Sequence, residues 1–161
     1  MVIKHITVLG AGNMGSQIAA VLVNAGMQVR LLDVALDPND PNKLSRQAFE
    51  RITQPKKGLL YSAGFASNLS YGNFDEDLDQ PSISDLFIEA VSEDLAIKHA
   101  LWAKVAKIAK PSAILTTNTS GIPIAEVASI LDPEARSRFA GLHFFNPPRL
   151  IQPVELIPHE G

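Results

Sequence analysis

The sequence predicts an α/β fold of the Rossmann type, with a doubly wound and mostly parallel sheet. Apolar, strand-like runs alternate with helical patterns along the chain, which favours parallel strands joined by helices. The first such run leads into a glycine-rich turn that opens a helix, and the next run ends in an acidic residue. Residues 86–91 form a nearly continuous apolar run, which is typical of a strand buried on both faces.

Residues 5–33 predict a βαβ unit. Residues 5–9 alternate and contain β-branched side chains, so they predict a buried strand that ends at Gly10. Residues 13–25 carry apolar side chains at helical spacing, and Gly26 lies just beyond them as a helix stop. Residues 28–32 predict a second strand, which ends at Asp33 and should lie parallel to the first.

The remaining elements follow from the same patterns. Residues 94–109 predict the clearest helix, with Ile97, Leu101, Val105 and Ile108 on its buried face. The other predicted segments are a loop at 35–41, a helix at 43–53 stopped by Pro55, a connector at 56–67, a short strand at 68–71, an acidic loop at 75–79, a strand at 113–116, a helix at 124–131 and strands at 139–144 and 154–157.

Length and composition narrow the classes of protein. The 161 residues correspond to about one domain, and 46% apolar with 19% charged residues is typical of a folded globular chain. The chain has no cysteine, so disulfides, zinc ribbons, iron–sulfur clusters and a cysteine nucleophile are excluded, and we predict no metal site. A net charge of −3 argues against a nucleic-acid partner. No apolar run reaches the roughly 18 residues of a membrane span, and no signal peptide is apparent, so we expect a cytoplasmic protein.

The segment from Gly10 to Gly15 matches the G-x-G-x-x-G pattern of a phosphate-binding turn. The first glycine permits the tight turn, Gly12 lets the backbone approach a pyrophosphate, and Gly15 allows the helix to pack close to the strand. Free N–H groups at the start of the helix would then face the phosphates. Asp33, at the end of the second predicted strand, can accept both ribose hydroxyls and would repel a 2′-phosphate, so NAD is favoured over NADP. FAD, another adenine nucleotide, and a turn without ligand stay open as alternatives.

Three further stretches identify a family resemblance: residues 88–98, residues 117–120 (Thr-Asn-Thr-Ser) and residues 141–147 (Gly-Leu-His-Phe-Phe-Asn-Pro). Together with the glycine turn, and in the same order and approximate spacing, they resemble the L-3-hydroxyacyl-CoA dehydrogenase family over residues 3–158. The resemblance implies NAD-dependent oxidation of an L-3-hydroxyacyl-CoA to a 3-ketoacyl-CoA, as in fatty-acid β-oxidation.

The resemblance also implies roles for individual residues. His143 matches the catalytic base, Glu155 its carboxylate partner, Ser120 the residue that contacts the substrate oxygen, and Asn146 a substrate-side position. The chemistry agrees, because histidine can take a hydroxyl proton near neutral pH and a carboxylate on its other ring nitrogen fixes the tautomer. The predicted cofactor-binding residues are Gly10, Gly12, Asn13, Met14, Gly15, Asp33, Ala90, Val91, Glu93, Lys98 and Asn118.

Each role has a structural alternative. His143 could be an ordinary structural histidine, Glu155 a solvated strand residue, and Ser120 a cap for the turn before Pro123. For the whole protein, the alternatives are a catalytically silent dinucleotide-binding module and a dehydrogenase of a related short-chain hydroxyacyl-CoA or hydroxy acid.

The sequence departs from the family pattern in the segment after the second predicted strand. Between residues 43 and 57 it carries Lys43, Arg46, Arg51, Lys56 and Lys57 against a single acid, Glu50. This basic segment either contacts the phosphates of coenzyme A or forms a solvated helix face. Residues 38–47 and Gly121 are more similar to the large multifunctional members, which also carry an enoyl-CoA hydratase part.

Family members continue beyond the last predicted strand into a helical domain that contributes dimer contacts and part of the substrate cleft. We therefore expect residues 1–161 to be a truncated NAD-binding domain, inactive alone, of a parent protein that is a homodimer.

Overall fold

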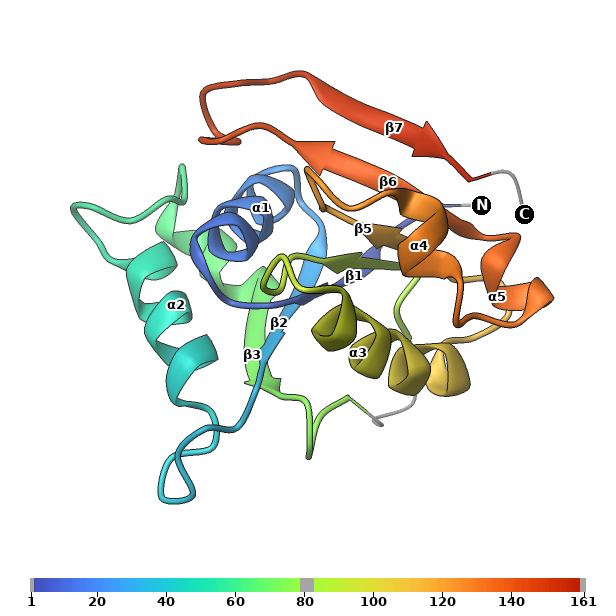
Figure 1. The fold of residues 1–161 in the computed structure, drawn as a ribbon. Helices are drawn as coiled ribbons and strands as arrows, with labels where there is room; N and C mark the ends of the chain where they lie inside the picture. Colours follow the sequence, from blue (N-terminus) through green and yellow to red (C-terminus); the bar gives the residue numbers. More distant parts are fainter. Residues whose placement is uncertain (1, 79–82, 160–161) are drawn as a thin grey trace.

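A seven-stranded sheet with helices on both faces forms the molecule in the computed structural model, which describes residues 2–78 and 83–159 (Figure 1). Asp79, at the end of the predicted acidic loop, lies outside the described residues. The strands are β1 (His5–Leu9), β2 (Gln28–Asp33), β3 (Leu69–Asn73), β4 (Leu86–Glu89), β5 (Ile114–Thr117), β6 (Phe139–Phe144) and β7 (Val154–Pro158). The helices are α1 (Asn13–Asn24), α2 (Lys43–Thr53), α3 (Leu95–Ile108), α4 (Ile124–Ala128) and α5 (Pro133–Arg136), with a 3₁₀ helix, η1 (Ala63–Asn68).

The strand order β3-β2-β1-β4-β5-β6-β7 confirms the predicted Rossmann-type fold. Every neighbouring pair from β3 to β6 is parallel, and β7 pairs antiparallel with β6. The chain leaves β1 first toward β2 and β3, and later returns to place β4 on the other side of β1. The carboxyl ends of β1 and β4 therefore form a topological switch point, where open α/β sheets bind their ligands.

Two apolar cores lie on opposite faces of the sheet because successive side chains of a strand alternate between faces. On β1, Val8 packs into the core under α1 and α2, whereas Leu9 packs into the core under α3, α4 and α5. Leu31 and Leu32 of β2 repeat this division. Burial on both faces explains the continuous apolar runs of the central strands.

The structure corrects three details of the predicted elements. Residues 63–68 of the predicted connector form η1, where the Ser62 side chain accepts a hydrogen bond from the Gly64 N–H. The helix predicted at 124–131 ends at Ala128, and α5 begins beyond it because Asp132 caps the Ala135 N–H and Pro133 occupies the first turn. Ile97 is 46% exposed, and Lys98 takes the corresponding buried position of α3.

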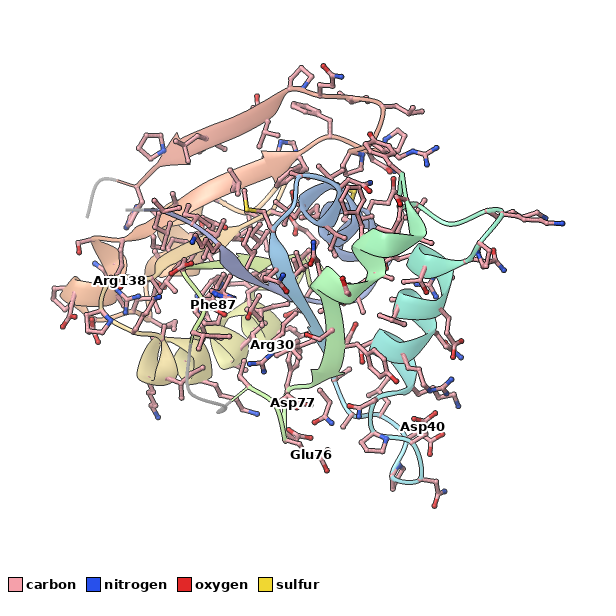
Figure 2. All side chains as sticks on the ribbon, turned by 180° about the vertical axis from the view of Figure 1, so that it is seen from behind. Arg30, Asp40, Glu76, Asp77, Phe87 and Arg138 are labelled. Atoms are coloured by element: carbon pink, nitrogen blue, oxygen red, sulfur yellow. The ribbon has the colours of Figure 1, made fainter. Side chains whose placement is uncertain are left out.

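A hydrogen bond from Arg30 of β2 holds the segment that follows β3. Figure 2 shows Arg30 on β2 beside Asp77, whose carbonyl oxygen accepts a hydrogen bond from the Arg30 guanidinium. Burial lowers the pKa of Arg30, and the Asp77 carboxylate opposes this shift. Within residues 2–78 and 83–159, no helix is long and apolar enough to cross a membrane.

The two-faced core predicts a contrast between two leucines. Leu31→Ala removes a fully buried side chain and should lower the free energy of unfolding by about 2–5 kcal/mol. Leu156→Ala, at a position 67% exposed on β7, should change it by less than about 0.5 kcal/mol. Urea unfolding followed by the fluorescence of Trp102, the single tryptophan, measures both values. Equal losses in the two variants would contradict the assigned core.

Candidate active site

Two adjoining cavities lie at the carboxyl ends of the central strands. The larger, of about 620 Å³, is lined by Gly10 and Asp33 together with apolar side chains that include Phe74, Ile97 and Leu101. The smaller, of about 590 Å³, is lined by Asn13, Met14, Glu93, Lys98, Asn118 and Ser120. Both share Gly12 and residues 90–92, so they form one crevice that follows the end of β4.

The glycine turn has the geometry that its pattern predicts. Gly10 has φ of +104°, and a Cβ there would lie 2.6 Å from the Ala90 carbonyl oxygen. A Cβ on Gly15 would lie 1.8 Å from the carbonyl oxygen of Gly10, so α1 can approach β1 only with glycine at this position. A Cβ on Gly12 would meet nothing within 4 Å, because this residue faces the crevice. No side chain caps α1, and its first N–H groups can therefore bind a phosphate.

Asp33 is positioned to receive a ribose at the end of β2. Its Oδ2 accepts a hydrogen bond from the Ala11 N–H at 2.6 Å, and its Oδ1 accepts one from the Val34 N–H at 2.7 Å. Each carboxylate oxygen has a second lone pair, so both can still accept from ribose hydroxyls. The turn, the open space beside Gly12 and the carboxylate of Asp33 together fit a dinucleotide.

The smaller cavity brings together Glu93, Lys98, Asn118 and Ser120, which come from three separate segments. Asn118 is nearly buried, and its Oδ1 accepts a hydrogen bond from the Phe144 N–H at 2.8 Å, which ties the end of β5 to β6. Burial alone would raise the pKa of Glu93. Other groups outweigh burial and lower this pKa to about 2. They are the Thr119 hydroxyl and the Gly121 and Ser120 N–H groups, which donate hydrogen bonds to Glu93, and the nearby Lys98 ammonium.

His143, Glu155 and Ser120 form a continuous hydrogen-bonded group. His143 on β6 lies directly opposite Glu155 on β7, and its Nδ1 is 2.8 Å from Glu155 Oε2. In a neutral imidazole that donates from Nδ1 to this carboxylate, Nε2 carries the lone pair. The Ser120 hydroxyl lies 3.0 Å from Nε2 and can donate to it in that tautomer. The structure thus brings together residues that lie 23 and 12 positions from the histidine along the chain.

Asn146 lies apart from the two cavities, in the loop after β6. Its Oδ1 accepts from Gln17 Nε2 at 3.4 Å, and the same amide nitrogen donates to Asn13 Oδ1 at 3.0 Å. Gln17 was not predicted as a site residue, because its place in the first helix of the glycine motif carries no pattern of its own. It links a predicted cofactor residue with a predicted substrate residue.

Glu89 is the second residue that the sequence patterns missed. It is fully buried at the end of β4, where its carboxylate lies 2.7 Å from the Lys98 ammonium. A charged residue inside an otherwise apolar strand was the available signal, because a carboxylate is almost never fully buried without a partner.

Part of the basic segment at 43–57 is already neutralised. Lys43 pairs with Asp37 at 3.1 Å, and Arg46 pairs with Asp40 at 2.5 Å and with Glu50 at 2.9 Å. The segment therefore presents a weaker positive field than its sequence indicated.

The fold and this crevice define the chain as a dinucleotide-binding domain. The family model described as "3-hydroxyacyl-CoA dehydrogenase, NAD binding domain" matches residues 5–161. The chain belongs to the 3-hydroxyacyl-CoA dehydrogenase family as its NAD-binding domain, and NAD is its cofactor.

Individual relatives agree with this assignment. A chain of Deinococcus radiodurans that carries the name of a 3-hydroxyacyl-CoA dehydrogenase is 41% identical over 98% of this chain and 46% of its own length. A chain of Rickettsia prowazekii that carries the name of a fatty acid oxidation complex trifunctional enzyme is 40% identical over 96% of this chain and 22% of its own length. The solved structure of 3-hydroxybutyryl-CoA dehydrogenase from Escherichia coli K12 superposes with a TM-score of 0.80 at 32% identity, over 97% of this chain and 32% of that one. The chain thus spans less than half the length of each of these relatives.

Gly12→Ala tests the placement of NAD. The added methyl group meets no protein atom, so the fold should stay intact. The methyl group would occupy the space of the pyrophosphate, and the NADH dissociation constant should therefore rise at least about tenfold. Gly64→Ala, in η1, is the matched control, because its Cβ would meet only Ser62 at 3.8 Å. Fluorescence titration with NADH measures both variants. Unchanged affinity in Gly12→Ala would place the dinucleotide elsewhere.

The low pKa of Glu93 predicts a pH-dependent contribution to stability. The pKa falls from 4.5 to about 2 on folding, so the charged form is favoured in the native state. The resulting stabilisation is complete well above pH 4.5 and is lost as the pH falls toward 2. The difference in unfolding free energy between the wild type and Glu93→Gln should therefore shrink over this range. Glu134→Gln, an exposed carboxylate on α5, serves as the control in the same urea titrations.

Proposed function

We propose that the protein of which this domain is part oxidises L-3-hydroxyacyl-CoA to 3-ketoacyl-CoA with NAD. The observation that carries this proposal is the hydrogen-bonded group of Glu155, His143 and Ser120 at the mouth of the crevice. Oxidation of a secondary alcohol needs a base for the hydroxyl proton beside a hydride acceptor. His143 on β6 would be this base, and the residues that line the smaller cavity would hold the nicotinamide end of NAD, which accepts the hydride.

Each residue has a distinct part in the proposed reaction. His143 Nε2 takes the proton from the substrate hydroxyl, and Glu155 keeps Nδ1 protonated and stabilises the imidazolium that forms. The Ser120 hydroxyl, now 3.0 Å from Nε2, turns to the substrate oxygen and donates to the carbonyl in the reverse direction. NAD, when bound, supplies the hydride acceptor. Gly12 would adjoin its pyrophosphate, Asp33 would bind the ribose of its adenosine half, and Asn146 serves the substrate side.

The substrate class comes from the family rather than from the cavity. Membership supports a hydroxyacyl-CoA, and the relative named for a fatty acid oxidation complex supports a place in β-oxidation. Lys56 and Lys57, beyond the neutralised part of the basic segment, are the residues we propose for coenzyme A phosphates. A homodimeric parent protein, a further helical domain and a cytoplasmic location stay predictions.

A short acyl chain is the second candidate. The structural similarity to 3-hydroxybutyryl-CoA dehydrogenase from Escherichia coli favours it. Comparison of kcat/KM for acyl-CoA substrates of increasing chain length distinguishes the two candidates. Binding of NADH by the parent protein with no turnover of any of them would indicate a silent dinucleotide-binding module, whereas the same result is expected for residues 1–161 alone.

His143→Gln in the parent protein tests the proposed base. The amide cannot take a proton, so kcat should fall about 100- to 10,000-fold. The NADH dissociation constant should stay the same, because His143 lines neither part of the crevice. His99→Gln is the control, because His99 contacts the Glu126 carbonyl between α3 and α4, away from the crevice. The decrease in NADH absorbance during reduction of 3-ketoacyl-CoA measures kcat in both variants. Near-normal turnover in His143→Gln would refute the assignment of His143 as the base.

A further inference from the structure

A buried ion pair between Glu89 and Lys98 lies at the wall of the smaller cavity, and no step of the reaction proposed above uses it. Glu89 and Lys98 are 0% and 1% exposed, and their charged groups lie 2.7 Å apart. Desolvation of two charges costs several kcal/mol per ion unless further hydrogen bonds satisfy them. Glu89 has these bonds, because its Oε1 also accepts from the Val91 N–H at 2.9 Å and its Oε2 from the Thr117 hydroxyl at 2.6 Å.

Lys98 also reaches a second carboxylate. Its Nζ lies 3.3 Å from Glu93 Oε2, so a single ammonium is placed between two acidic groups. The other oxygen of Glu93, Oε1, faces the chain that follows β5. It accepts hydrogen bonds from the Thr119 hydroxyl, from the Ser120 N–H at 3.0 Å and from the Gly121 N–H at 2.9 Å.

Both carboxylates therefore hold the same short segment, residues 117–121, which we call the Ser120 turn. Glu89 holds its beginning through the hydroxyl of Thr117, which in turn accepts from the Thr119 N–H at 3.3 Å. Glu93 holds its end. Lys98 joins the two carboxylates, and without this cation they would repel each other in a partly buried region.

The geometry of the Ser120 turn matters because Ser120 must meet His143. Its hydroxyl lies 3.0 Å from His143 Nε2, whereas its own backbone N–H is bound by Glu93. A misplacement of about 1 Å in a catalytic group can cost a factor of about 100 in rate. Hydrogen bonds to a charged acceptor are stronger and more directional than neutral ones, so they suit a positioning task.

We propose that Glu93, joined through Lys98 to buried Glu89, is a positioning residue that sets Ser120 against His143. This inference rests on the proposed function and extends it. Glu93 then acts on the reaction through Ser120, and its side chain is already committed to the Ser120 turn. A residue that contacted only the cofactor would instead act through the affinity for NAD.

A double-mutant cycle in the parent protein separates these two roles. Ser120→Ala should lower kcat on the order of 100-fold. Glu93→Gln should lower it about 10- to 100-fold by releasing Ser120. The double variant should be no slower than Ser120→Ala alone, since Glu93 has nothing left to position. NADH affinity should stay close to that of the wild type in all three, and Glu134→Gln, on α5, is the matched carboxylate control. Additive losses, or a loss confined to NADH affinity, would overturn the proposal.

A second readout does not require turnover. The NMR chemical shift of His143 Nε2 responds to the hydrogen bond from Ser120. It should move in the same direction in Ser120→Ala and Glu93→Gln, with no further change in the double variant. A wild-type shift in Glu93→Gln would overturn the positioning role. Absence of turnover in the wild-type parent protein would instead count against the proposed function alone.

If Glu93→Gln does not fold, Thr119→Val takes its place in both measurements. It removes the hydroxyl that donates to Glu93 and accepts from the Ile122 N–H at 3.1 Å, keeps the size of the side chain, and should give a change in the same direction. Glu89→Gln is avoided, because it would leave Lys98 buried beside a neutral amide.

Discussion

The close contact between Gly10 and Ala90 is the constraint on which the crevice depends. β1 lies between β2 and β4, both parallel to it, so three carboxyl ends meet at one edge of the sheet. The chain can turn into α1 at this edge only if Gly10 has positive φ and carries no Cβ. Because α1 then begins beside the end of β4, its free N–H groups and the residues after β4 face the same space. The dinucleotide site is a consequence of this packing.

The carboxyl end of β4 also holds two charged groups, Glu89 and Lys98, in a region that is otherwise apolar. Glu89 ends β4 one residue before Ala90, and it is buried because Lys98 on the first turns of α3 returns to it. The Glu89–Lys98 ion pair thus joins the end of β4 to the beginning of α3, the helix that connects β4 with β5. The hydrogen bonds of Glu89 and Glu93 tie the Ser120 turn to the carboxyl ends of the strands.

The regular elements could be predicted from the sequence because their patterns are local. The helix at Lys43–Thr53 and the first strand begin and end where periodicity and stop signals place them. The family resemblance predicted Ser120, His143 and Glu155, and the structure brings these three together. Glu89 and Gln17 could not be found in this way. Their partners lie 9 and 129 positions away, so the charge inside an apolar strand marked Glu89 without indicating its partner, and nothing local marked Gln17.

The pairing of His143 with Glu155 depends on register rather than on sequence spacing. β7 is exposed along its whole length, and the two side chains meet because they are directly opposed across the β6–β7 ladder. A slip of one residue would move Glu155 to the other face of the sheet. Gly141, opposite Ile157, accommodates the observed register, because a Cβ there would lie 2.8 Å from Ile124 and 3.0 Å from Ile157. The close approach at Gly141 thus helps to keep the carboxylate beside the histidine, much as Gly10 keeps the phosphate-binding turn beside β4.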